Sequence, residues 1–533
     1  MYLSLFTGTH TVSAIVPKLA RRASHRKPCP AAGYHSGSMM RDASRRPASP
    51  RVLARRHLRS RLAPALALVV FAALAVTALA QKPPAVAVAP AKPAPALAQK
   101  PTTPPQAPRA SRLIVIPGAR VLDAAGGRYL PPATIVIEDG RIKSITPEPP
   151  AGLPDTATTV KAAGGVVVPG LVDSHAWAAP TADLDSDYSY LMGLAHGVTT
   201  YRVLDARTSW AVSQRARART GATLAPRLVT SGRGIQQGAT PGRWLFDAPD
   251  AQAAADEVTR QVAARVDWIA GDTNLGPDVI RAMLAAAQGT PVRISAWPGA
   301  SSLSDLADLR VASIESLAYP LKPRAGPNAD DAWLAAPAKD LTALRTRLIR
   351  SRAVLVPLLA AARSRAFPEE VLNGEALTLL PEARRAAITN ELKALSPADI
   401  TKARRAWASQ AAFLAQFVRA GGRVAAGSGF AWHGYPPPGI GVHLELAAMV
   451  RAGLSTEDAL RAATSNGADL LGLGKDAGVV APGVEADILI VMGDPLKRIQ
   501  DLQNIVTVVR GGEVFSAKDL LARAQQALAT GPR

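Results

Sequence analysis

The sequence predicts an α/β protein, a (β/α)8 TIM barrel with a small β-sandwich domain formed from both chain ends. Short apolar runs alternate with helical stretches over the middle of the chain. Strand-like pairs with turn residues flank that middle on both sides. The length of 533 residues suits a barrel plus one smaller module.

The predicted barrel occupies residues 164–473. Buried parallel strands read as short apolar runs separated by helices, and eight such runs occur here: GGVVVPGLVDSH, HGVTTYRVLDA, PRLVTSG, VDWIAGD, TPVRISAW, VASIESL, AVLVPLL and GRVAAGSG. Residues 368–405 read as a helical insertion after the seventh strand. GLSTEDALRAATSNGADLLGL is expected to close the barrel as a helix with Ser455 or Thr456 near its N-cap.

The β-sandwich is predicted from residues 112–163 together with 474–520. In ATIVIEDGRIKSI, two alternating apolar runs flank Asp139-Gly140, which is a hairpin pattern. At the far end, ADILIVMGDP and NIVTVVRGGEVF are again strand-like, and the second turns at Gly511-Gly512. Strands at both ends of a long α/β middle indicate one small sheet module assembled from both ends.

Residues 1–80 read as a leader with a signal peptide and cleavage near 80/81. A basic segment precedes the apolar stretch 62–79, which ends in the small-residue site Ala78-Leu79-Ala80. We expect a periplasmic or secreted protein with no stable membrane span after cleavage; the alternative is an uncleaved N-terminal membrane anchor. Residues 81–111, rich in Pro and Ala, are expected to form a linker.

The positive charge is concentrated in this leader. Thirteen Lys or Arg and one acid precede residue 62, so this stretch carries +12 of the total +21. Nucleic-acid binding would need the cations on the folded part, so we exclude that class of partner. The single cysteine, Cys29, also lies in the leader, which leaves the rest without a thiol for disulfides or metal ligation.

Four motifs occur in the order typical of the amidohydrolase superfamily. Residues 168–175 (VPGLVDSH) resemble its first barrel strand, and GVTT at 197–200 resembles the approach to its second. Residues 460–472 resemble its last barrel helix, and PGVEAD with GDP at 482–495 resembles its return to the sheet module. The resemblance covers about residues 112–515 and is closest to the imidazolonepropionase-like and Xaa-Pro dipeptidase-like branch. It implies hydrolysis of C–N bonds other than ordinary peptide bonds, with one or two divalent metals polarising the carbonyl and activating water.

Most of the metal ligands that this resemblance implies are absent. The family pattern has His-x-His on strand one, Lys or Glu on strand four, His on strands five and six, and Asp on strand eight. Only His175 remains, and the other ligand positions hold Trp177, Ala270, Ser295, Ser316 and Gly429. Indole, methyl and hydroxyl groups do not replace imidazole on Zn²⁺. We therefore expect no intact metal site, and Zn only if a rearranged site exists.

Three functions stay open. The first is a pseudoenzyme that acts as a binding or partner subunit, with a small-molecule ligand or a related amidohydrolase as its partner. The second is an active amidohydrolase with a rearranged site around His175, with Asp205, Glu315 and His433 as further candidates. The third is a small-molecule binding protein that takes an apolar anion in a pocket edged by Trp177, Arg293 and Trp297.

The remaining charged residues near strand ends have simpler interpretations. Four acids, Asp173, Asp205, Asp272 and Glu315, follow or end predicted strands, and some are expected to pair with Arg202 or Arg293. His196 is expected at a helix end and His443 in helix packing.

Overall fold

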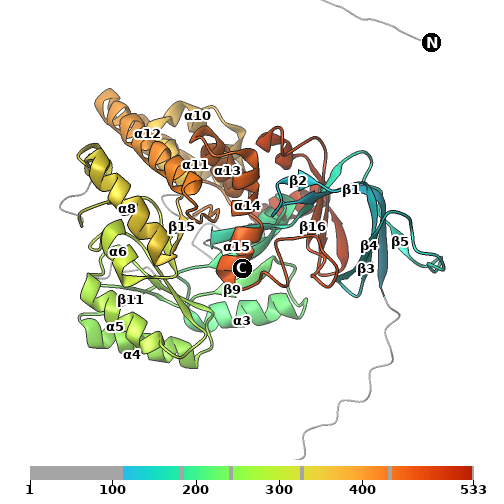
Figure 1. The fold of residues 1–533 in the computed structure, drawn as a ribbon, viewed down its shortest axis with the longest axis horizontal. Coiled ribbons are helices and arrows are strands. Elements are labelled where there is room, and N and C mark those ends of the chain that lie inside the picture. The colour runs from blue at the N-terminus through green and yellow to red at the C-terminus, as the bar shows by residue number, and fades with distance from the viewer. Residues whose placement is uncertain are drawn as a thin grey trace, which may run out of the picture. The chain divides into compact units, whose positions relative to one another are not determined.

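The computed structural model describes residues 112–176, 178, 185–238, 244–323, 329–429 and 435–530, all within the compact unit Thr103–Arg533. These residues form a mixed α/β fold, as predicted (Figure 1). The leader and the whole linker lie outside the described residues, as do Trp177 and His433. Within the described ranges, no helix is long and apolar enough to cross a membrane.

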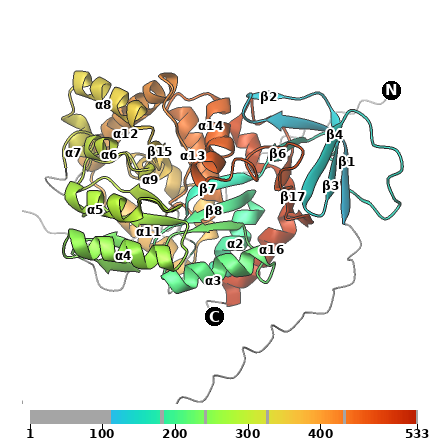
Figure 2. The same cartoon turned by 60° about the horizontal axis from the view of Figure 1, so that its bottom comes forward.

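Both ends of the described chain contribute to one nine-stranded sheet, ordered β18-β17-β16-β6-β1-β3-β4. Figures 1 and 2 show its blue and red strands side by side. β6 joins the two ends because it pairs parallel with β1 and antiparallel with β16. The strands are β1 (Leu113–Asp123), β3 (Ala133–Glu138), β4 (Arg141–Thr146), β6 (Val166–Pro169), β16 (Ile488–Val491), β17 (Ile505–Arg510) and β18 (Glu513–Ser516), with β2 (Arg128–Tyr129) and β5 (Thr158–Thr159) paired to β1.

The two predicted hairpin turns are confirmed. Asp139 and Gly140 have φ of 48° and 82°, and Gly511 and Gly512 have φ of 60° and 77°. Two consecutive left-handed residues are what the tight turns that match the twist of antiparallel strands require. A Cβ on Gly512 would lie 2.7 Å from the Cα of Gly140, so the two turns, one from each end of the chain, pack against each other.

Seven of the eight predicted parallel strands are present. A three-stranded sheet holds β7 (Leu171–Ala176), β8 (Val198–Val203) and β9 (Arg227–Thr230). A six-stranded sheet holds β12 (Trp268–Gly271), β13 (Arg293–Ala296), β14 (Ser313–Glu315) and β15 (Val354–Val356), and β10 (Gly234–Gln236) and β11 (Leu245–Asp247), which we did not anticipate, extend its edge. All these pairs are parallel, and a bridge between Ser231 and Trp268 links the two sheets.

The prediction of a regular eighth strand over GRVAAGSG is wrong. Residues 423–428 form only one isolated bridge, from Val424 to Leu355 of β15. The segment divides its backbone hydrogen bonds: Ala425 N–H donates to Leu355, Ser174 N–H of β7 donates to the Ala426 carbonyl, and Ala426 N–H donates to Ala462 beyond the strands. Divided bonding of this kind gives no continuous ladder.

Helices connect the parallel strands and cover them on the outside (Figures 1 and 2). They are α2 (Ser186–Ala195), α3 (Thr208–Arg219), α4 (Ala251–Ala263), α5 (Pro277–Ala287), α6 (Leu303–Leu309), α7 (Ala329–Leu334), α8 (Ala338–Ser351), α9 (Leu359–Ala366), α12 (Pro397–Arg419), α13 (Ile440–Arg451) and α16 (Ala517–Thr530). The stretch 368–405 is helical: it contains α10 (Pro368–Leu372), the 3₁₀ helix η1 (Glu375–Leu379), α11 (Glu382–Lys393) and the start of α12.

The predicted closing helix is two helices, so the prediction of one continuous helix is wrong. α14 (Thr456–Ala462) has the predicted N-cap, Ser455, whose side chain accepts from Asp458 N–H. The chain then breaks at Thr464 before α15 (Ser465–Leu471). The break has a clear cause, because the Ala463 carbonyl accepts a hydrogen bond from Val172 N–H of β7, 2.7 Å away, instead of one from its own helix.

A separate apolar cluster fills the space among the parallel strands. It holds buried residues of the parallel strands, of the segments beside them and of α15: Val172, Val229, Trp268, Trp297, Val354, Val356, Leu358, Ala425, Ala468, Leu470, Leu471 and Ala477. The α15 residues lie near the amino-terminal ends of the strands, since Leu470 O accepts from Arg293 at the start of β13. Polar side chains concentrate at the opposite, carboxyl-terminal ends, which is where we place the candidate site.

Candidate functional site

His175 and Glu315 form the centre of the candidate site. His175 lies near the end of β7, Glu315 is the last residue of β14, and both are fully buried. His175 Nδ1 lies 2.7 Å from Glu315 Oε2. Burial alone would raise the pKa of Glu315, but Arg202, His175 and Ser313 outweigh it and hold that pKa below its usual value. The ionised carboxylate can only accept, so Nδ1 carries the proton and donates.

Arg202 fixes the other side of this carboxylate. Its Nη2 donates to Glu315 Oε1 at 2.6 Å, and its Nη1 donates to Ser313 Oγ at 2.8 Å. Ser313 Oγ in turn donates to Glu315 Oε1 at 2.6 Å. The guanidinium also lies 4.6 Å from the Trp268 ring centroid. The predicted pairing of a strand-end acid with Arg202 is therefore present, and every partner of the arginine is buried.

The Asp173 carboxylate accepts hydrogen bonds from backbone N–H groups of the site. Its Oδ1 accepts from His175 N–H at 3.1 Å and from Ser428 N–H at 2.9 Å, and its Oδ2 accepts from Ser428 Oγ at 2.5 Å. These bonds hold β7 against residues 423–428. Burial raises the pKa of Asp173 to about 6, although the bonds from Ser428 and His175 lower it.

The residues at the family ligand positions do not fit a catalytic metal centre. Ala270 and Ser295 are the penultimate residues of β12 and β13, and Ser316 directly follows β14. They present a methyl group and two hydroxyls. A Cβ on Gly429 would lie 3.8 Å from His175 Cδ2 and 3.4 Å from Leu358, so an aspartate is missing directly beside the one remaining histidine. Within the described ranges, no group of three or more His, Cys, Asp or Glu is arranged to hold a metal. One imidazole nitrogen does not make a metal site.

The structure separates the residues of the predicted anion pocket. Trp297 follows β13 and meets His175 edge-on, with ring centroids 4.8 Å apart. Arg293 is the first residue of β13, and its Nη1 donates to Leu470 O at 2.6 Å. Ser295 lies opposite Ser313, so Arg293 stands four residues below the level of Glu315, about 13 Å along the strands. Arg293 therefore does not join the site, and Trp177 lies outside the described residues.

The remaining candidate acids lie at strand ends but outside the network of hydrogen bonds around Glu315. Asp205, with φ of 57°, follows β8, and its backbone N–H donates to Ser231 Oγ at 3.1 Å. Asp272 follows β12, and its Oδ1 accepts from Thr273 N–H at 2.5 Å. His433, which was also a candidate for a rearranged site around His175, lies in a segment outside the described residues.

The two other described histidines meet where the C-terminal end of α2 reaches α13, with ring centroids 6.1 Å apart. His196 is the C-cap of α2, and His443 lies in α13, as predicted. His443 Nε2 donates to His196 O at 2.8 Å. Burial, with a smaller contribution from His196, lowers the pKa of His443 to about 4, so the ring is neutral in the folded protein. These contacts are structural.

Sequence reasoning missed three further residues of this region. Ser313 shares the strand face of Glu315 at the i, i+2 spacing, and that spacing alone was enough to find it. Ser428 directly precedes the Gly429 position. Glu445 of α13 had no local signal: it is buried, and its carboxylate accepts from the backbone N–H groups of Leu359 and Ala360 at the start of α9. Burial raises the pKa of Glu445 to about 7.

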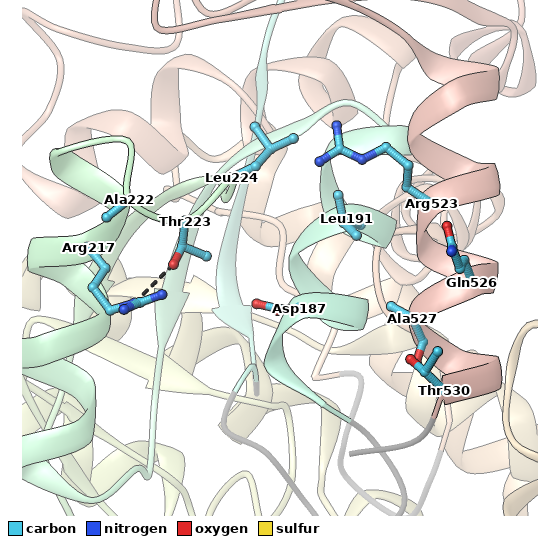
Figure 3. Close-up of a pocket in the computed structure, with 10 residues that line it drawn as sticks. All are labelled: Asp187, Leu191, Arg217, Ala222, Thr223, Leu224, Arg523, Gln526, Ala527 and Thr530. Carbon is cyan, nitrogen blue, oxygen red and sulfur yellow. Dashed lines mark hydrogen bonds between the residues drawn. The ribbon is translucent and has the colours of Figure 1, made fainter. Parts of the chain in front are cut away.

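Away from this site, a hollow lies between α2, α3 and α16 and has a volume of about 420 Å³ (Figure 3). Arg217 and Arg523 stand on opposite sides of it, with Asp187 and Leu191 of α2 between them. Arg217 Nε donates to Thr223 Oγ1 at 3.0 Å. None of its lining residues belongs to the network around Glu315, and both arginines are exposed to solvent.

Comparison with known proteins places the chain in a family. A family model described as the amidohydrolase family matches residues 166–515, so the chain belongs to the amidohydrolase family, and the predicted resemblance is confirmed. Among curated protein sequences, none matches.

Solved structures agree on the fold. A prolidase complexed with N-methylphosphonate-L-proline is 18% identical, with a TM-score of 0.58, over 76% of this chain and 99% of that one. A putative prolidase from Bifidobacterium longum is 20% identical, with a TM-score of 0.59, over 78% and 99%. The bottromycin amidohydrolase is 21% identical, with a TM-score of 0.60, over 78% and 90%. At these identities the likeness concerns the fold, since one fold carries many activities.

Proposed function

We propose that this member of the amidohydrolase family is a pseudoenzyme that has lost metal-dependent hydrolysis and acts through binding. One observation carries the proposal: the only imidazole left at the family ligand positions is hydrogen-bonded to Glu315, and that carboxylate is already committed to Arg202 and Ser313. Hydrolysis by the family route needs a metal-activated water. The remaining donors are too few to bind that metal.

For the architecture, we propose that the parallel strands close into a (β/α)8 barrel and that the terminal sheet folds over itself as a β-sandwich. Support for closure comes from the backbone bonds of residues 423–429 to both β15 and β7. Support for the sandwich comes from a separate apolar core within the nine-stranded sheet, to which β1, β3, β4, β6, β16 and β17 all contribute.

We also propose export to the periplasm or beyond the cell, on the strength of the basic, apolar and small-residue segments before residue 81. Retention as an N-terminal anchor is the alternative. N-terminal sequencing of the protein from its host distinguishes the two, because cleavage leaves Gln81 as the first residue.

The metal content of the purified chain tests the loss of hydrolysis. After exposure to Zn²⁺ and Mn²⁺ followed by desalting, elemental mass spectrometry is expected to find less than about one tenth of an equivalent. Close to one equivalent, lost in the variant His175→Ala, would overturn the proposal. A matched control is His196→Ala, which removes an imidazole outside the site.

The second candidate is an amidohydrolase with a rearranged site, and the Glu315–His175 contact favours it, because a carboxylate that orients an imidazole is a common arrangement for a general base. Hydrolysis of dipeptides or lactams by a metal-free sample, abolished by His175→Ala, would support this candidate. Activity that persists in that variant would exclude it.

A further inference from the structure

Among the described residues, the second ring nitrogen of His175, Nε2, is a buried polar atom without a hydrogen-bond partner, as is Ser174 Oγ on the same strand. An unsatisfied buried polar atom costs stability, and native proteins keep few of them. His175 stands near the carboxyl-terminal end of its strand, where related folds carry their catalytic groups. An unpartnered polar atom at this position points to a ligand that binds from outside the protein.

The hydrogen bonds of the ring decide what that partner must offer. Glu315 holds the Nδ1 proton, because its ionised carboxylate accepts from Nδ1 at 2.7 Å. With Nδ1 donating to Glu315, the atom of the ring that is left to accept a hydrogen bond is Nε2. The matching group on a ligand is an O–H or N–H donor.

The surroundings of Nε2 decide the rest of the ligand. Trp297 meets the ring edge-on, and Gly429 lies beside its Cδ2: a Cβ on Gly429 would be 3.8 Å from Cδ2 and 3.4 Å from Leu358 Cδ1. The neighbouring wall is therefore apolar. Among the described residues, four buried carboxylates, Asp173, Asp272, Glu315 and Glu445, belong to this end of the strands, against one buried cation, Arg202. Above about pH 7, where Asp173 and Glu445 are ionised, an anionic ligand would add to an excess of negative charge, which favours a neutral ligand.

The backbone around Nε2 is built in conformations that side chains rarely adopt. Leu358 and Ser316 have φ of 52° and 74°, both in the left-handed region, and both follow the ends of their strands. Strained residues of this kind cluster at ligand sites. Leu358 and His175 both lie within 4 Å of the position that a Cβ on Gly429 would take, so the Leu358 side chain is a neighbour of the site.

We propose that the carboxyl-terminal end of the strands binds a small neutral molecule with an apolar body and one O–H or N–H group, which donates to His175 Nε2. The inference rests on the proposed function, because a metal on Nε2 would remove the acceptor. It replaces the apolar anion predicted from the sequence, since Arg293 does not reach this site.

Three matched probes test the inference on the full chain. Phenol offers an apolar ring with one neutral donor, anisole has the same ring without a donor, and benzoate adds a negative charge. Long-range ¹H–¹⁵N correlation spectra of histidine-labelled protein follow Nε2 directly, and comparison with His175→Gln assigns its signal. We expect phenol to shift that signal and to bind about 10-fold more tightly than anisole, with benzoate weakest.

Two leucine variants keep the test informative if His175→Gln fails to fold. Leu358→Ala makes room beside the Gly429 position, next to His175, and should tighten phenol binding several-fold. Leu471→Ala, a buried leucine of the same apolar cluster near the other end of the strands, should leave binding unchanged. Arg523→Ala in the hollow beside α16 should also leave it unchanged.

Each contrary result is decisive. Equal affinity for phenol and anisole would show that Nε2 is not used, and tightest binding of benzoate would contradict the charge argument. No phenol binding up to about 10 mM would overturn the inference, since fragments of this size bind in the millimolar range when a site exists. If the sample is metal-free, such a failure concerns the ligand alone; if it holds an equivalent of metal, the proposed function fails first.

Discussion

The buried contact between Arg202 and Glu315 yields the sharpest stability prediction. Both side chains are 0% exposed, and their charged atoms lie 2.6 Å apart. Glu315→Gln keeps the shape of the side chain but removes its charge, so the guanidinium of Arg202 stays buried without a counter-charge. Breaking a buried pair in this way costs about 3–5 kcal/mol. Because His175 and Ser313 lose the same ionised acceptor, we expect the upper part of that range.

Urea unfolding measures this loss as a lower midpoint with an unchanged slope. The matched control is Glu513→Gln, because Glu513 pairs with Arg112 at 3.0 Å with side chains 53% and 66% exposed. That control should lose less than about 1 kcal/mol. The double variant Glu315→Leu with Arg202→Met removes both charges and should recover most of the stability. A loss in Glu315→Gln no larger than in the control would refute the reasoning.

Two further predictions concern backbone strain and pH. Ser316→Gly should raise the free energy of unfolding by roughly 1 kcal/mol, because glycine relieves the left-handed φ of 74°; a lower melting temperature would show that the hydroxyl stabilises more than the strain costs. His443 has its pKa lowered to about 4 by burial, so wild type should lose on the order of 3 kcal/mol relative to His443→Gln as pH falls from about 6.5 to 4. The quantity to compare is the difference in unfolding free energy between the two proteins, because the raised pKa values of Asp173 and Glu445 stabilise both of them as pH falls through this range. Parallel pH profiles of the two proteins would contradict the prediction.

The fold was predictable where one segment determines its own structure. Apolar runs between helices gave seven parallel strands in their places, and Asp139-Gly140 and Gly511-Gly512 turn as their residue types require. The two errors share one cause. The segment 423–428 and the break at Thr464 are both set by backbone hydrogen bonds to distant residues, to Ala462 in one case and to β7 in the other. No local pattern carries that information.

The same distinction separates what was predictable at the site. The face of a strand on which a side chain lies follows from its position in the alternation, so the ligand substitutions could be read from the motifs. The height of a side chain along the strands depends on the stagger between neighbouring strands, which a single segment does not contain.

Arg202 and Arg293 were therefore equivalent candidates to pair with a strand-end acid, although their heights differ: Arg202 reaches Glu315, whereas Arg293 binds Leu470 O near the other end of the strands. This difference in height changes the chemistry expected of the ligand. With Arg293 beside His175, the site would attract an anion. Without it, the carboxylates dominate, Arg202 is already paired, and the group left to recognise a ligand is the lone pair of His175 Nε2. A neutral ligand avoids repulsion from the carboxylates, and a hydrogen-bond donor on it pairs with this lone pair.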